Sequence, residues 1–184
     1  FANASAQSTT FTPNAAGTYT ISLLTTNLTT NCTTTNTVTL TTAASTLAGT
    51  QPTVSGTYCD LTITGTATLS GPLTVNGTLT LATGASLNTN CQTVSGPGSF
   101  TMQAGSTLSV CDPAGLSLTG ANGPIQVAGT RTFSTDANYI YNGTVAQTTG
   151  AGLPATVRSL TVNNAAGVTQ TQGLSVTRLL TLTN

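Results

Sequence analysis

The chain has 184 residues and almost no charge: three lysines or arginines, three aspartates or glutamates and no histidine give a net charge of zero. Threonine makes up about a quarter of it. Acid–base catalysis and metal binding draw on histidine, glutamate, lysine and clustered aspartate, so we expect no enzyme activity, no cofactor and no metal. The lack of basic residues predicts no nucleic-acid partner, and no apolar run approaches the ~20 residues of a membrane helix.

Residues 1–44 are expected to form an N-terminal β segment that is separate from the rest. Within it, GTYT is followed by Cys32 and by a threonine-alternating stretch. This arrangement resembles the last strands of an immunoglobulin-like or PKD-type module. Alone the segment is too short for a sandwich of about seven strands. It is expected to cap the following domain, to lie along it as a hairpin, or to be completed by another chain.

Residues 45–184 show strand signals throughout and almost no helix signal. Short segments alternate apolar residues with threonine or serine, and glycine, asparagine or proline separates them. Three such strands make a turn of roughly 20 residues, within the range of solenoid repeats. We therefore expect an all-β parallel β-helix (solenoid) over 45–184, with an antiparallel β-sandwich of the same strands as the alternative. Strands are expected at residues 61–64, 67–70, 73–75, 78–82, 86–89, 92–95, 99–103, 107–110, 116–119 and 124–129.

Alternation along each strand also predicts the interior of the tube. Aliphatic side chains would point inward and threonine and serine outward, because successive residues of a strand face opposite sides. The expected interior set is Leu61, Ile63, Leu69, Leu73, Val75, Leu79, Leu81, Leu87, Val94, Phe100, Met102, Leu108, Val110, Leu116, Leu118, Ile125 and Val127.

Four cysteines, Cys32, Cys59, Cys91 and Cys111, are widely spaced. Without a CxxC pair or a histidine, a zinc site is not expected. Their even number fits two disulfides formed in an oxidising compartment, so we expect an extracellular or cell-surface protein. Cys59 or Cys91 is expected to bond to Cys111. Buried thiols are the alternative.

The charged residues suggest little chemistry. Asp60 and Asp112 each follow a cysteine and could in principle bind calcium together, but two or three turns would separate them, so we expect solvated turn residues. Arg131 and Asp136 are close in sequence and are expected to pair across a corner. Such a surface pair contributes at most about 1 kcal/mol.

Two further functions are carried as alternatives. Repeated Thr-x-Thr pairs look somewhat like the threonine-rich antifreeze solenoids, which implies an ice-binding face if the pairs align turn after turn. Tyr139 and Tyr141 lie on the same face of one expected strand. Packing is their expected role, and the alternative is a glycan-binding module that uses these tyrosines or Arg131, with surface glycans as the partner.

The segment Tyr139–Asn184 resembles a repeat of large secreted surface proteins of Bacteroidetes, which are adhesin-like β-solenoids. It covers about a quarter of the chain and implies a structural or adhesive role without any catalytic residue. The resemblance rests on Tyr139, Gly143, Gln147, Gly152, Leu153, Pro154, Leu160, Val162, Asn163, Asn164, Gly167 and Val168.

The sequence closes on LSVTRLLTLTN, an apolar alternating strand that has no polar or helical cap. Solenoid ends carry unpaired backbone groups, so an uncapped end predicts either further repeats of a longer chain or end-to-end joining of copies. We expect an extracellular structural protein whose copies form a head-to-tail filament or adhesin fibre by strand addition. The candidate assembly residues are Leu174, Val176, Leu179, Leu180 and Leu182.

Overall fold

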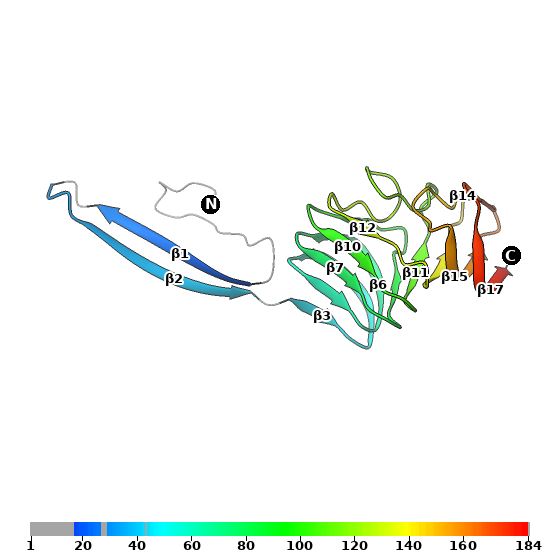
Figure 1. The fold of residues 1–184 in the computed structure, drawn as a ribbon, viewed down its shortest axis with the longest axis horizontal. Helices are drawn as coiled ribbons and strands as arrows, with labels where there is room; N and C mark the ends of the chain where they lie inside the picture. The colour runs from blue at the N-terminus through cyan, green and yellow to red at the C-terminus, as the bar shows by residue number, and fades with distance from the viewer. Residues whose placement is uncertain (1–16, 27–28, 43, 184) are drawn as a thin grey trace.

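The computed structural model describes residues 17–26, 29–42 and 44–183, and the regular structure in these ranges is entirely β-sheet (Figure 1). An antiparallel hairpin is followed by a parallel β-solenoid of about seven turns. The predicted parallel β-helix is confirmed, and the sandwich alternative is wrong because all strand pairs after the hairpin are parallel.

One side of the solenoid is a five-stranded parallel sheet, the short sheet. Its strands succeed one another at intervals of one turn, as expected for a coil rather than for hairpins. In spatial order they are β3 (Ser45–Leu47), β5 (Leu61–Ile63), β7 (Thr78–Leu81), β10 (Ser99–Met102) and β12 (Arg131–Thr132).

A second side is the long sheet, which runs through every turn. In spatial order it contains β4 (Thr50–Tyr58), β6 (Thr66–Val75), β8 (Ser86–Asn88), β11 (Thr107–Val110), β13 (Asn138–Tyr141), β15 (Thr156–Asn163) and β17 (Ser175–Thr183). The far half of β6 continues round the corner and pairs with β9 (Val94–Ser95). In the last turns, β14 (Gln147–Thr148) pairs with β16 (Val168–Thr169).

Glycine forms one corner of the coil because successive turns touch there through their backbones. A β-carbon on Gly98 would lie 2.0 Å from the carbonyl oxygen of Gly77, and one on Gly129 would lie 2.6 Å from that of Gly98. No side chain fits at such distances. The glycines that separate the expected strands therefore allow close stacking of the turns as well as a change of direction.

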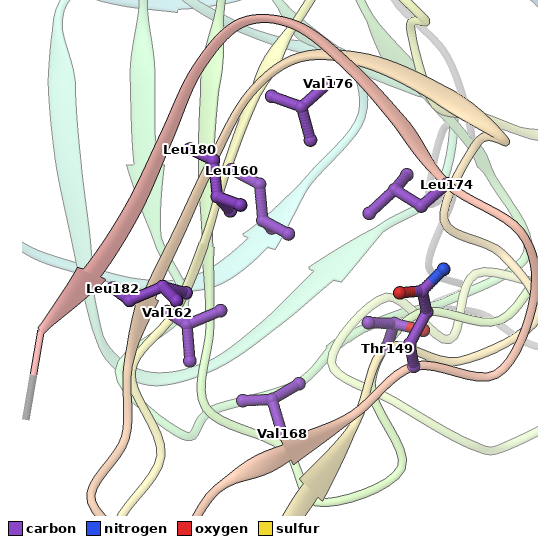
Figure 2. Close-up of a pocket in the computed structure, with 9 residues that line it drawn as sticks. Thr149, Leu160, Val162, Val168, Leu174, Val176, Leu180 and Leu182 are labelled. Carbon is purple, nitrogen blue, oxygen red and sulfur yellow. The ribbon is translucent and has the colours of Figure 1, made fainter.

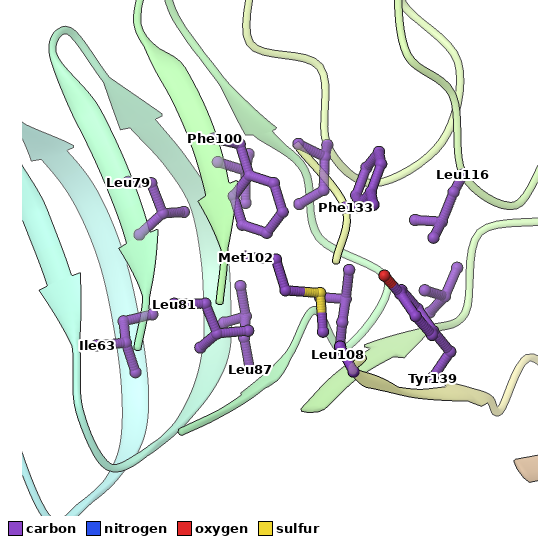
Figure 3. Packing of buried hydrophobic residues seen from close by; sticks show 14 of the residues in the cluster. Ile63, Leu79, Leu81, Leu87, Phe100, Met102, Leu108, Leu116, Phe133 and Tyr139 are labelled. Carbon is purple, nitrogen blue, oxygen red and sulfur yellow. The ribbon is translucent and has the colours of Figure 1, made fainter. Parts of the chain in front are cut away.

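The interior is built from in-register columns of apolar side chains. Leu61, Leu79 and Phe100 occupy one position of successive turns, and all three are fully buried. Figure 3 shows Leu79 and Phe100 among the packed side chains. The Phe133 ring packs against Phe100 with 5.6 Å between ring centroids. Every predicted interior residue is buried except Leu118, which is 54% exposed.

Leu118 belongs to a stretch where two expected strands do not form. Between β11 and β12 the described chain has only a single bridge, from Ile125 to Val94, in place of strands at 116–119 and 124–129. Gly115, Gly120 and Gly123 there have φ of 67°, 76° and 76°, a left-handed conformation that ends extended runs. Elsewhere the expected strands at 67–70 and 73–75 merge into β6, and 92–95 shortens to β9.

The hairpin consists of β1 (Gly17–Thr26) and β2 (Thr33–Thr42), paired over their full length. Figure 1 shows that it projects away from the first turn of the solenoid rather than lying along it, so that expectation is wrong. Its strands pair only with each other among the described strands. The resemblance to a larger module rests in part on residues 10–16, which lie outside the described residues.

Candidate assembly surface at the ends of the solenoid

In the last turn of the described chain, the interior columns have a described neighbouring turn on one side only. One column of the long sheet continues from Tyr139 to Leu160 to Leu180, whose exposed fractions are 0%, 6% and 54%. A second column ends at Leu182, which is 69% exposed. A side chain in the middle of a column is covered by turns on both sides, whereas Leu180 and Leu182 have a described neighbour on one side only.

These leucines line an apolar cavity of about 250 Å³ at this end (Figure 2). The paired strands β15 and β17 line one side of the cavity, with Leu160 beside Leu180 and Val162 beside Leu182, and Thr149, Val168 and Leu174 lie across from them. Of the predicted assembly residues, Leu174, Val176, Leu180 and Leu182 line the cavity. The fifth, Leu179, pairs with Ser159 on the outer face of the sheet and is 58% exposed.

The backbone of β17 presents an open edge as well. β17 pairs with β15 on one side, and no strand of the described chain pairs with its other side. A long apolar edge of this kind is a template for another strand. The end of the tube thus combines free hydrogen-bonding groups with exposed leucine.

At the opposite end of the molecule, β3 and β4 are the terminal strands of the two sheets, and the hairpin projects beyond them (Figure 1). One face of the hairpin is apolar, because Tyr19 pairs with Leu40 and Ile21 with Val38. Val38 is 65% exposed and Leu40 39%. A lone two-stranded hairpin is only marginally stable in water, so this apolar face requires packing against another surface.

The structure brings two of the four cysteines together. Cys91 and Cys111 form a disulfide between successive turns, with their α-carbons 5.2 Å apart, which confirms one of the expected pairings. The second expected disulfide is not formed. Cys32 lies exposed in the loop between the hairpin strands, and Cys59 is half-buried just after β4.

The charged residues are separated from one another, with one weak contact as the exception. Asp136 approaches Arg158 at 4.0 Å, so the expected pair with Arg131 is wrong. The turn brings Arg158 near Asp136, whereas Arg131 points into the tube and is buried. Asp112 accepts a hydrogen bond from the Ala114 backbone at 2.8 Å, as a turn residue does. Asp60 similarly accepts one from the backbone of the next turn, at Thr78 (2.7 Å).

Tyr139 and Tyr141 are core residues. Both are fully buried, and their hydroxyls donate to the carbonyl oxygens of Ser134 (2.7 Å) and Thr149 (2.6 Å). Burial raises the pKa of both phenols above the ordinary value of 10.0, and for Tyr141 the nearby Tyr139 adds to the effect. The expected packing role is confirmed, and stacking of these rings on sugars is wrong.

The outer face of the short sheet carries a feature that the sequence did not reveal. One threonine from each strand falls in register with the next, which we call the threonine column: Thr46, Thr62, Thr80, Thr101 and Thr132. The flanking residues Leu61 and Ile63 are buried, so Thr62 between them points outward. The recurring Thr-x-Thr pairs were the available signal, but they do not give the register.

In the part of the chain that the structure describes, no group of three or more histidine, cysteine, aspartate or glutamate residues is placed to hold a metal ion. Nor do these residues form a helix long and apolar enough to cross a membrane. Comparison with family models, with curated proteins and with solved structures found no match. No known protein therefore adds information on the fold or on the two end surfaces of this chain.

Proposed function

We propose that this chain is an extracellular structural protein whose copies join head to tail into a filament or adhesin fibre. The observation that carries the proposal is the exposure of Leu180 and Leu182, which continue interior columns and have a described turn on one side only. In the proposed contact, the first turn of a neighbouring copy supplies a turn on the other side. β4 and β17 are both nine residues long and belong to the same sheet, so β4 of the neighbour would extend the parallel ladder.

The position of the apolar surfaces supports a contact that repeats. The leucines of β17 lie at one end of the molecule and the apolar hairpin face at the other (Figure 1). A contact between two different surfaces of the same chain is heterologous, and it produces a filament when the rotation does not close. The neighbour would also cover the hairpin face, which includes Ile21 and Val38.

Deleting residues 175–183 tests the proposal at its simplest. The intact chain should form filaments in negative-stain micrographs and concentration-dependent large species in sedimentation, and the shortened chain should remain monomeric. The intact chain remaining a monomer at all accessible concentrations would refute the proposal. In that case, flanking repeats of a longer chain become the better partner for β17.

A second candidate function, ice binding, is favoured by the threonine column. Neighbouring strands lie about 4.8 Å apart, so the column presents hydroxyl and methyl groups at a fixed repeat along the outer face of the short sheet. Beside it, Thr78 and Ser99 form the start of a parallel hydroxyl column. The outer face of the long sheet lacks this regularity, because Ile140 and Leu179 interrupt its hydroxyl columns.

Substitution on the two faces separates ice binding from a generally polar exterior. Replacing Thr80 and Thr101 with leucine should abolish thermal hysteresis if the threonine column binds ice. Thr161→Leu on the long sheet is the matched control and should leave hysteresis unchanged. Absence of hysteresis in the unsubstituted chain, or equal loss in the control, would exclude the threonine column as an ice-binding face.

A further inference from the structure

Arg131 is the only charged side chain buried in the described part of the chain, with 5% of its surface exposed. It stands in register with Phe100 and Leu79, so it occupies a position that is apolar in the preceding turns. A charge at such a position is costly unless it is paired. The single ion pair among the described residues joins Arg158 to Asp136, and no carboxylate contacts Arg131.

The groups that Arg131 does contact are neutral. Its Nε donates to the carbonyl oxygen of Val127 (3.0 Å), and its Nη1 and Nη2 donate to those of Ser117 (3.2 Å) and Gly120 (2.5 Å). These bonds link the strand-free stretch between β11 and β12 to β12. They use three of the five guanidinium N–H groups and leave the positive charge without a counter-ion. Burial lowers the pKa of Arg131, in line with an uncompensated charge.

Arg131 also forms part of the wall of a half-open cavity of about 340 Å³. The stretch between β11 and β12 supplies the rest of the wall, including Leu118, Thr119 and Gln126. The Gln126 side chain donates its Nε2 to the Gly123 carbonyl oxygen at 2.8 Å, which leaves its Oε1 as an acceptor. The volume falls within the range of small-molecule sites, and hydroxyl, amide and backbone groups around one cation suit a polyhydroxylated anion.

We propose that this cavity binds a carboxylate-bearing sugar, with the carboxylate on Arg131 and the sugar hydroxyls on the surrounding polar groups. The two remaining guanidinium N–H groups would donate to the carboxylate oxygens. The site lies beside β12, away from β17 and the cavity at the last turn, so it is independent of filament formation. It would give the solenoid an affinity for acidic glycans that the buried tyrosines cannot provide.

The small number of arginines makes a direct test possible. The chain has three arginines, so the ¹⁵N-labelled protein has three Nε–H signals, which Arg158→Lys and Arg178→Lys assign. D-glucuronate is the probe, D-glucose is the matched neutral sugar, and acetate is the plain carboxylate. The Arg131 signal should shift saturably with glucuronate, with a dissociation constant at least tenfold below that for acetate, and should not shift with glucose.

Three results would overturn the proposal: no saturable shift with glucuronate, an equal shift with glucose, or acetate binding as tightly as glucuronate, which would mean an adventitious ion only. An Arg131→Gln variant that folds should lose the binding, while Arg178→Gln, which removes an exposed cation of β17, should retain it. If Arg131→Gln does not fold, the titration of the unsubstituted chain still decides. A glucuronate-containing oligosaccharide that binds more tightly than the free sugar assigns the ligand to a polymer.

Discussion

Replacing Leu180 and Leu182 with threonine should weaken assembly about 30-fold without unfolding the subunit. The two side chains are 54% and 69% exposed in the single chain. Fully burying a leucine contributes about 1.5–3 kcal/mol, so covering the exposed part contributes about 1–2 kcal/mol each. Threonine retains part of this, so a net loss of about 2 kcal/mol for the pair corresponds to about 30-fold in the association constant. Threonine also favours strands, so β17 should persist.

Sedimentation velocity over a range of concentrations measures the effect, and thermal melting confirms that each variant is folded. Leu118→Thr is the matched control, because Leu118 is also 54% exposed but lies on the loop between β11 and β12 rather than at the end of the tube. It removes the same exposed leucine fraction as the Leu180→Thr part of the double variant, at a site that the proposed contact does not use. It should assemble at the same concentration as the unsubstituted chain.

Two results would refute the reasoning. In the first, the double variant assembles at the same concentration as the unsubstituted chain, so the exposed columns contribute nothing to the contact. In the second, Leu118→Thr weakens assembly as strongly as the double variant, so association reflects general surface hydrophobicity. Either result would leave the open edge of β17 without evidence for a partner copy.

Three further predictions concern stability, each measured by urea unfolding. Replacing Cys91 and Cys111 with serine should lower the free energy of unfolding by about 3 kcal/mol, because the disulfide closes a 20-residue separation in the unfolded chain; an unchanged value would mean that the bond does not form. Leu79→Ala should lower the free energy of unfolding by about 2–5 kcal/mol, because truncating this fully buried side chain leaves a cavity in the column. A decrease under 1 kcal/mol would contradict close packing. The contribution of Tyr139 and Tyr141 to the free energy of unfolding should be constant below pH 10 and then fall by up to about 1.4 kcal/mol per pH unit for each. The reason is that their raised pKa keeps both phenols neutral in the folded chain, while they ionise in the unfolded chain. The fall should flatten when both residues are replaced by phenylalanine.

Alternation predicted the interior well because it is a local property of each strand. Leu79 and Leu81 point inward whichever turn lies beside them, and the same holds for Leu108 and Val110. The prediction that Leu118 is buried was wrong because alternation does not show whether a neighbouring strand is present to pair with. In the stretch between β11 and β12, left-handed glycines remove the chain from the sheet, and the apolar residue of an unpaired segment has no fixed inward side.

Contacts between turns were not predictable from the sequence, because the turns differ in length. The threonine column advances from Thr46 by 16, 18, 21 and 31 residues at successive strands. No fixed repeat gives that register. For the same reason, Arg131 and Asp136, five residues apart, do not pair, whereas Arg158 reaches Asp136 from the following turn. The buried cation and its cavity depend on that register as well.

Stacked turns explain why hydroxyls rather than charges cover this solenoid. Equivalent outward positions repeat about every 4.8 Å, so a charged residue kept in register would face its own like charge in the next turn. At that distance two like charges repel by about 1 kcal/mol in water and by more near a protein surface. Threonine avoids this repulsion and favours the strand conformation. The filament and ice-binding proposals use separate surfaces, the last turn and the threonine column, so a variant that abolishes assembly leaves the column intact. If both functions hold, the double variant Leu180→Thr, Leu182→Thr should retain the hysteresis of a single subunit while losing any gain that comes from the columns of many subunits in one fibre.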